Sequence, residues 1–214
     1  MIQPRVKRGA GPKSKLTKAT YRRKALPHLL KDFESKCAYC LDPSEFRHPS
    51  QNHIDHFDCN LGGRRRHQYK NLMLSCSTCN GCKHDKPVVN KFDSKQHLIN
   101  CTLENEFPTH ISEKEDGSWL HHTPAGFYHL KALCLDEPCH NKKRSMRRKL
   151  ADRILSLYTH AIQYVSYHPA ETHRQIMDTA REILRELDNM PPLVVEKGVV
   201  TVREWLRQNG VVLD

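Results

Sequence analysis

The sequence predicts an α+β protein in which a small cysteine-rich unit lies between a basic N-terminal arm and a mainly helical C-terminal region. Three observations support this class. Two C-x-x-C pairs occur in a segment poor in apolar residues, two short runs flank a turn sequence, and apolar residues recur at helical spacing after residue 141. The expected units are the arm (1–27), the cysteine-rich core (28–92), a connecting region with a hairpin (93–140) and a helical region that offers a docking surface for a partner (141–214).

The composition indicates a basic protein of the cytoplasm. The 214 residues include 35 Lys and Arg against 24 Asp and Glu, a formal net charge of +11, which favours polyanionic partners. No apolar stretch approaches the roughly 18 residues of a membrane span, and the N-terminus has no apolar secretory signal. Because a reducing compartment keeps thiols free, we expect metal ligation rather than disulfides, with Cys59, Cys82, Cys101 and Cys134 as packed thiols.

The N-terminal arm carries positive charge only. No acidic residue occurs in the first 31 positions, whereas ten Lys and Arg residues do. Gly9, Gly11 and Pro12 predict that its first part is a flexible coil. Apolar residues over 26–33 then mark a short amphipathic helix that leads into the cysteine-rich core.

Secondary structure is also indicated beyond the core. Runs over 106–111 and 118–122 flank the turn-forming residues 115–117 and predict a hairpin. Apolar residues at helical spacing over 150–165 and 176–187 predict a helical hairpin that breaks at Pro169. Thr201 and Glu204 form a capping box for a last short helix, which Gly210 closes.

Two pairs of cysteines have the spacing of metal-binding turns. Cys37 and Cys40 form one C-x-x-C pair, Cys76 and Cys79 form the other, and 35 residues separate them. Each turn places two sulfurs on one side of a tight loop, and two turns supply the tetrahedral thiolate set that Zn²⁺ prefers in closed structural sites. The alternative, a redox-active dithiol, needs a strand-helix-strand context that neither pair has. The sequence therefore predicts a structural zinc site.

The residues between and after these pairs carry a second motif. Asp55 and His56 are adjacent, Asn71 precedes an apolar stretch, and Asn80 directly follows Cys79 with lysines beyond it. In this order and spacing, the segment from 37 to 86 resembles the HNH endonuclease family. The resemblance implies a zinc-stapled ββα-metal core, in which a β-ribbon and a helix hold a catalytic divalent cation. It also implies metal-dependent hydrolysis of phosphodiester bonds, with DNA as the favoured substrate.

Residue chemistry suggests roles within this motif. His56 suits a general base, because an imidazole with an unperturbed pKa near 6.5 takes a proton from water at neutral pH, and the resemblance gives it that role. Asp55 alternates to the other side of the strand, where its carboxylate is a hard ligand for Mg²⁺ or Mn²⁺. If the next helix begins at Asn80, His84 faces the same way; the resemblance favours Asn80 as a metal ligand and leaves His84 open. Asn71 matches the central asparagine of the family, which orients the loop that carries the base.

Basic residues border the motif. Contacts to nucleic acid are expected from Arg64, Arg65 and Arg66 on the loop before the central asparagine, and from Lys83 and Lys86 beside the helix. Contacts of this kind bind the phosphate backbone without reading base sequence. A second basic run over 142–149 either extends this track or is a solvated helix face, and the sequence leaves both interpretations open.

The layout of the whole chain has a looser resemblance. The chain has a basic N-terminal segment, then an HNH core, then a trailing segment that precedes helices. This layout is similar to that of stand-alone HNH proteins of bacterial anti-phage systems, such as the PtuB-type nucleases of Septu and those that accompany retrons. Such proteins work beside an ABC-type ATPase, which the resemblance implies as a protein partner. The alternative from another class is a non-catalytic zinc-stabilised module that binds nucleic acid, in which Asp55 and His56 are only scaffold.

Overall fold

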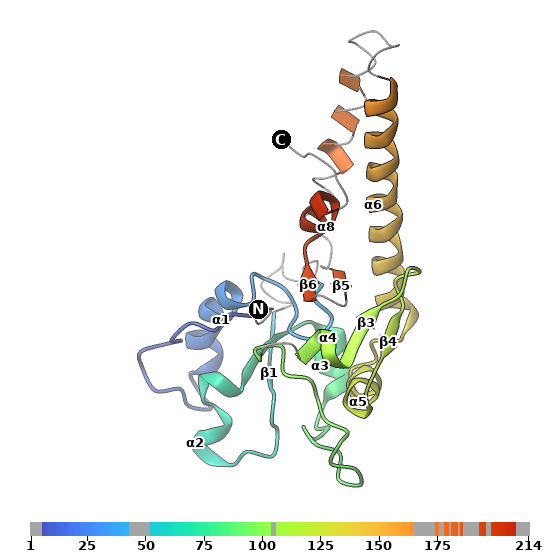
Figure 1. Cartoon of the computed structure of the whole chain (residues 1–214). Coiled ribbons are helices and arrows are strands. Elements are labelled where there is room, and N and C mark those ends of the chain that lie inside the picture. The colour runs from blue at the N-terminus through green and yellow to red at the C-terminus, as the bar shows by residue number, and fades with distance from the viewer. Residues whose placement is uncertain are drawn as a thin grey trace.

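The computed structural model describes residues 6–42, 52–103, 106–164, 174–175, 178–179, 181–183, 185, 193–195 and 198–208. Short helices and small antiparallel sheets make up a mixed fold, and the long helix α6 rises away from the part that contains α1, β1 and α3 (Figure 1). In chain order the elements are α1 (Tyr21–Asp32), β1 (His53–His56), α2 (Gly63–Arg66), the 3₁₀ helix η3 (Tyr69–Asn71), β2 (Leu72–Ser75), α3 (Ser77–Lys83), α4 (Glu106–His110), β3 (Ile111–Glu113), β4 (Trp119–His121), α5 (Pro124–Ala132), α6 (Pro138–Tyr164), β5 (Leu193–Val195), β6 (Gly198–Val200) and α8 (Val202–Gln208). Within the described ranges, none of the helices is long and apolar enough to cross a membrane.

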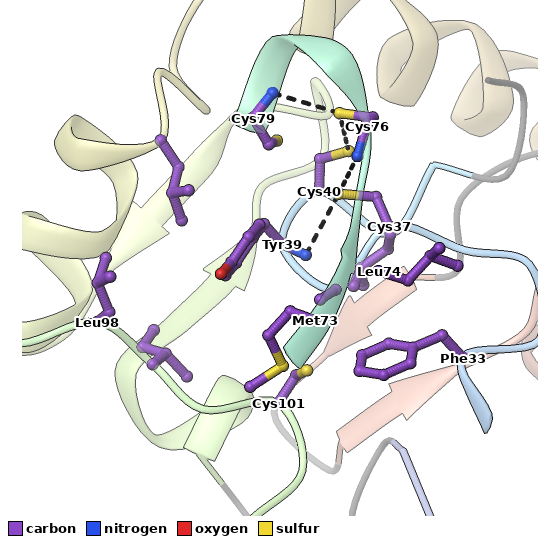
Figure 2. Close-up of a cluster of buried hydrophobic side chains, with 14 of the residues drawn as sticks. Phe33, Cys37, Tyr39, Cys40, Met73, Leu74, Cys76, Cys79, Leu98 and Cys101 are labelled. Atoms are coloured by element: carbon purple, nitrogen blue, oxygen red, sulfur yellow. Dashed lines mark hydrogen bonds between the residues drawn. The ribbon is translucent and has the colours of Figure 1, made fainter. Parts of the chain in front are cut away.

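A two-stranded ribbon and a helix form the centre of the cysteine-rich core. β1 and β2 are antiparallel, with His53 opposite Ser75 and His56 opposite Leu72, and α3 follows β2. All four residues of β2 are buried, because this strand packs against α1 as well as pairing with β1. Figure 2 shows part of this core, with Met73 and Phe33 gathered near the cysteines. The order strand, strand, helix is the one expected for a ββα core.

The N-terminal segment is not the flexible coil that the sequence predicts. Val6 is buried, and Arg8 donates to the backbone carbonyls of Tyr69 and Leu72 over 2.7 and 2.5 Å. Gly11 has a φ of +70°, and a Cβ there would lie 2.5 Å from the Tyr69 ring, so glycine permits this close contact. The segment from residue 6 onward therefore packs on the core, and the helix expected over 26–33 begins earlier, at residue 21.

The connecting region contains the predicted hairpin, with one correction. β3 pairs with β4, with Ile111 opposite His121 and Glu113 opposite Trp119. The sequence predicts a first strand over 106–111, but residues 106–110 form the helix α4. Phe107 and Ile111 are both buried and lie four residues apart, which is a helical period rather than the alternation of a strand.

The second basic run lies on α6, and its arginines are structural. Arg144 is buried, with its guanidinium 4.6 Å from the centre of the Trp119 ring and a hydrogen bond of 2.8 Å to the carbonyl of Gly117. Arg147 and Arg148 both form ion pairs with Glu113, whose side chain is buried. These contacts attach the β3–β4 hairpin to α6. The three arginines are thus neither a solvated face nor an extension of a nucleic-acid track.

The C-terminal region is helical over most of its described residues. α6 covers the first half of the predicted helical hairpin, and residues 178–179, 181–183 and 185 of the second half are helical, whereas Pro169 and Gly210 lie outside the described residues. The capping box is confirmed, because the N–H of Thr201 donates to Glu204 Oε2 over 2.7 Å and the N–H of Glu204 to Thr201 Oγ1 over 3.2 Å. The paired strands β5 and β6 are an addition that the sequence pattern does not predict.

A disulfide joins two cysteines for which the sequence predicts packed thiols. Among the described residues, the only disulfide links Cys82 on α3 to Cys134, which follows α5, with a Cα separation of 5.9 Å and a sequence separation of 52. Lys86 donates to the carbonyl of Ala132 over 2.9 Å in the same region. The prediction is wrong because tertiary packing, rather than sequence spacing, brings the end of α5 to the end of α3.

Candidate functional site

Four cysteines form a compact buried cluster of potential metal ligands. The sulfurs of Cys37, Cys40, Cys76 and Cys79 all lie within 4.8 Å of one another. Those of Cys40 and Cys76 are 3.8 Å apart. A tetrahedral Zn²⁺ with Zn–S bonds of about 2.3 Å holds its sulfurs roughly 3.8 Å apart, so the arrangement fits a structural zinc ion. The cluster predicted from the two C-x-x-C pairs is therefore confirmed.

Backbone N–H groups point toward these sulfurs (Figure 2). Cys76 is the N-cap of α3, and its sulfur accepts from the N–H of Cys79 over 3.3 Å. The sulfur of Cys37 accepts from the N–H groups of Tyr39 and Cys76 over 3.5 and 3.4 Å. Burial opposes ionisation of Cys37, but hydrogen bonds from the neighbouring thiols of Cys40, Cys76 and Cys79 hold its pKa well below the ordinary value. A thiolate in so buried a place is stabilised by a divalent cation.

The first cysteine turn is tied to the strand that carries the Asp-His pair. The phenol of Tyr39 donates to Asp55 Oδ2. Lys83 of α3 forms an ion pair with the same carboxylate, at 3.1 Å from Oδ1 and 3.0 Å from Oδ2, and donates to the carbonyl of His56 over 2.9 Å. Burial raises the pKa of Asp55, and the contacts with Lys83 and Tyr39 offset part of that rise. One buried lysine therefore holds β1 against α3.

Lys83 is not the phosphate-binding residue that the sequence predicts, whereas Lys86 stays a predicted contact. The Lys83 side chain is 0% exposed in its ion pair with Asp55. Lys86 is half-buried, with its ammonium on the Ala132 carbonyl. The prediction for Lys83 is wrong because position beside the motif does not reveal which side of α3 meets β1. Arg64 and Arg65 are exposed on α2, as expected, and Arg66 is half-buried.

Replacing Lys83 by methionine is expected to destabilise the protein by about 3–5 kcal/mol, because it leaves the Asp55 carboxylate buried without its cation. Urea unfolding measures the difference in free energy. The double variant Lys83→Met/Asp55→Asn removes both charges and should recover part of the loss. A single variant as stable as the wild type would contradict the buried ion pair.

His56 lies at the end of β1 within a group of three rings. Its Nε2 is 3.1 Å from Nδ1 of His67, which follows α2. Tyr21 of α1 stacks on His67 with ring centres 5.0 Å apart and contacts His56 at 5.1 Å. Burial lowers the pKa of His56 to about 4, and the charges of Arg66, His67 and Lys83 act in the same direction. The imidazole is therefore neutral at pH 7 and can accept a proton.

Tyr21 and His67 are residues of this site that sequence reasoning missed. His67 follows three arginines in a connection without periodicity, and Tyr21 belongs to the segment predicted to be an arm. Only the packing of α1 beside the β1–α2 connection brings their rings to His56. The one feature of the sequence that could have indicated His67 is that it is a further histidine between the Asp-His pair and the central asparagine.

Asn71 connects the chain on the two sides of the loop after β1. Its side chain is buried at the end of η3. Its Oδ1 accepts from the N–H of Asp58 over 2.9 Å, and its Nδ2 donates to the carbonyls of Asp58 and Arg66 over 3.1 and 2.9 Å. These are the backbone contacts that an orienting role for Asn71 requires.

Of the residues predicted to bind a catalytic cation, Asp55 is already paired with Lys83 and His84 is exposed beyond the end of α3. Lys83 and Tyr39 engage both oxygens of Asp55. Asn80 does not begin α3 but lies inside it, because the sulfur of the cysteine before Ser77 caps the helix. His84 is exposed beyond the helix end, with a φ of +43° and its Nδ1 3.2 Å from Asp85. In the described ranges, neither cluster of three or more His, Cys, Asp and Glu ligands includes Asp55 or His84. A cation at Asp55 would compete with the Lys83 ammonium for this carboxylate.

A basic cavity of about 780 Å³ adjoins His67. Residues of the N-terminal segment between 12 and 18 form one wall, and residues between 63 and 69 form the other. The lining includes Lys15 and Lys18 from the first wall and Arg64, Arg66 and His67 from the second. His56 does not line this cavity but contacts His67, which does.

The site combines a cluster of four cysteines, which holds a ββα unit, with a neutral histidine on the first strand of that unit. Both lie inside a segment that a known family describes. Residues 37–86 match the HNH endonuclease family. Among curated proteins, none matches the chain. HNH domains are generally nucleases, they act on nucleic acid and they use divalent metals. The chain thus contains an HNH domain over these residues, and Tyr21 and the cavity wall at 12–18 come from outside it.

Proposed function

We propose that the protein is a metal-dependent endonuclease that hydrolyses phosphodiester bonds of DNA, with His56 as general base. The observation that carries the proposal is the place of this imidazole. It lies in the HNH domain, it is neutral at pH 7, and it contacts His67 at a basic cavity. A neutral imidazole can accept a proton from an attacking water.

Hydrolysis breaks the bond between phosphorus and the 3′ oxygen. His56 takes a proton from water, the oxygen of the resulting hydroxide bonds to phosphorus, and the 3′ oxygen leaves with the electron pair of the broken bond. In the tautomer in which Nε2 of His56 donates to Nδ1 of His67, Nδ1 of His56 is the nitrogen that can take the proton. A divalent cation, when bound, would neutralise charge on the phosphate. Asp55, Asn80 and His84 stay the predicted ligands of this Mg²⁺ or Mn²⁺ ion.

The basic cavity is the proposed place of the DNA backbone. Lys15 and Lys18 on one wall and Arg64 and Arg66 on the other would meet the phosphates of a strand from two sides. Arg65 is exposed on the same short helix and adds to the positive field. Such contacts do not depend on base sequence and weaken as the salt concentration rises.

The double variant Lys15→Ala/Arg64→Ala is expected to bind duplex DNA more weakly and with a smaller dependence on salt. Loss of two phosphate contacts lowers the slope of log K against log salt by about 1.8. Fluorescence anisotropy of a labelled duplex at several salt concentrations measures the slope. Lys142→Ala/Lys149→Ala removes the same charge from exposed positions of α6 outside the cavity lining and should not change it. Equal slopes in all three proteins would place the DNA elsewhere.

Plasmid cleavage tests the nuclease itself. We expect the purified wild-type protein to cut supercoiled plasmid in Mg²⁺ or Mn²⁺ and to leave it intact when neither ion is added. Zinc content is measured in each preparation, so that loss of the thiolate site is not mistaken for loss of catalysis. If the folded, zinc-loaded protein binds the duplex without cutting it, with and without a partner ATPase, the non-catalytic zinc-stabilised module is the better description. The Asp55–Lys83 ion pair is the observation that favours this second candidate.

We further propose that the nuclease is the effector of a bacterial anti-phage system and acts with an ABC-type ATPase. The support is the layout of the chain, in which a basic segment precedes the HNH domain and α6 extends away from it (Figure 1). Phage plaque counts on cells that carry the protein with a candidate ABC-type ATPase test this proposal. Protection should require both proteins, and protection by the nuclease gene alone would contradict the partnership.

A further inference from the structure

A second group of potential metal ligands lies outside the HNH domain. His97, Glu106 and His110 each offer one ligand atom, and these atoms lie within 4.8 Å of one another. Glu106 and His110 begin and end α4, one helical turn apart, and His97 lies on a segment that is bridged to Val89. We propose that these three side chains bind a divalent transition-metal ion, for which Zn²⁺ is the best match. This inference does not depend on the proposed nuclease activity.

The distances among these three side chains suit a shared metal ion better than direct hydrogen bonds between them. Nε2 of His110 is 3.8 Å from Glu106 Oε2, which is too long for a hydrogen bond. The rings of His97 and His110 meet edge to face, with their centres 5.6 Å apart. The ligand atoms around a tetrahedral zinc ion with bonds of about 2.0–2.1 Å lie roughly 3.4 Å apart. Small side-chain rotations therefore bring all three groups onto one ion.

His110 is oriented for metal binding by its other ring nitrogen. Nδ1 of His110 is 2.6 Å from Oγ1 of Thr123, and the same oxygen caps α5 by accepting from the N–H of Gly126 over 3.1 Å. A hydroxyl oxygen has two lone pairs and can accept from both N–H groups. In the tautomer with the proton on Nδ1, that nitrogen donates to Thr123, and the lone pair of Nε2, which is 3.8 Å from Glu106 Oε2, can bind a metal. A hydrogen bond of this kind is the usual support of a ligating histidine.

The backbone of His110 is also fixed by neighbouring segments. Its carbonyl accepts from the N–H of His122 over 2.9 Å. A Cβ at Gly126 would collide with that carbonyl oxygen, so glycine is what allows α5 to approach the end of α4 so closely. Two of the three ligands are therefore on a short helix whose end is fixed by α5 and by the residue that follows β4.

The ligand set selects the class of metal. Two imidazoles and one carboxylate suit zinc and its neighbours among the transition metals, whereas Mg²⁺ prefers oxygen ligands. All three residues are half-buried, and three protein ligands leave one coordination position for water. A bound ion would link the segment at His97, which follows the HNH domain, to α4 and through Thr123 to α5. It would thus cross-link the connecting region between the HNH domain and α6.

Metal content of single variants tests the proposal. We expect the wild type to hold one equivalent of zinc more than His97→Ala, His110→Ala or Glu106→Gln. His122→Ala, which changes an exposed histidine in the same region, should keep the wild-type content. Mass spectrometry of the metal after dialysis gives the count, and circular dichroism shows that each variant is folded. Cobalt substitution separates the two sites, because only the four-thiolate site has sulfur-to-cobalt charge-transfer absorption, which every variant should retain.

Thr123, whose hydroxyl contacts Nδ1 of His110, provides a graded test. Thr123→Val should bind the second equivalent about 10–100-fold more weakly, whereas Thr123→Ser keeps the hydroxyl and should bind like the wild type. Equal zinc content in the wild type, His110→Ala and Glu106→Gln would overturn the proposal. A wild-type protein with a single equivalent, held by the cysteines, would overturn it without any variant.

Discussion

Replacement of Cys76 by serine is expected to unfold the HNH domain. Its sulfur completes the thiolate cluster, 3.8 Å from that of Cys40, and also caps α3 through the N–H of Cys79. Binding of structural zinc contributes an apparent free energy of about 10–16 kcal/mol in small zinc domains, and this is energy of folding. Whole domains are stable by only about 5–15 kcal/mol. Loss of one ligand therefore removes a share comparable to the entire stability of the domain.

Thermal unfolding followed by circular dichroism, with zinc measured in parallel, checks this expectation. Cys59→Ser is the matched control, because it makes the same chemical change at a half-buried position outside the cluster. It should keep its zinc and melt close to the wild type. A chelator strong enough to remove zinc should lower the melting temperature of the wild type as Cys76→Ser does. A Cys76→Ser protein that melts like the wild type would rule out the structural metal.

The second large effect is expected at His56. Loss of a general base lowers the rate of the chemical step by about 10²–10⁴-fold. The fold should survive in His56→Ala, because this imidazole is half-buried and its contacts are with Tyr21 and His67 at the edge of the core. Single-turnover cleavage of a labelled duplex measures the rate at saturating protein. His28→Ala, which removes an exposed imidazole from α1, should cut at the wild-type rate.

The dependence of the rate on pH gives an independent check on His56. Its pKa is lowered to about 4, so the base is neutral above that value and is lost only as the pH falls through it. The rate should therefore change little on going from pH 8 to 5.5. An imidazole with the ordinary pKa of 6.5 would already be mostly protonated at the lower value. An acid limb centred near 6.5 would contradict the lowered pKa of His56, and cleavage by His56→Ala at the wild-type rate would remove His56 from the base position.

Features that depend on short stretches of chain were predicted correctly. Each C-x-x-C pair sets its own turn, so Cys37 with Cys40 and Cys76 with Cys79 were recognisable as potential metal ligands before the fold was known. The capping box of Thr201 and Glu204 is likewise a contact between residues three apart. In both cases the interacting groups are near neighbours in sequence, and local backbone geometry is enough to bring them together.

Features that depend on packing between elements were not predicted. Lys83 has the sequence position of a phosphate contact, but the side of α3 that meets β1 makes it the buried partner of Asp55. Cys82 and Cys134 meet only because α5 ends beside α3. His67 likewise reaches His56 across a connection without periodicity. No local spacing encodes such contacts, because each depends on how two elements are oriented in space.

The sequence by itself determined the thiolate ligand set, the order of the ββα unit and the choice of His56 as the candidate base. The tertiary structure decided which basic side chains are accessible to a substrate and which carboxylate is already paired. It also decided that His56 is neutral and contacts His67 beside a basic cavity. The reason is physical. Ligand type and spacing are properties of a short segment, whereas burial, ion pairing and pKa depend on groups that distant segments bring close.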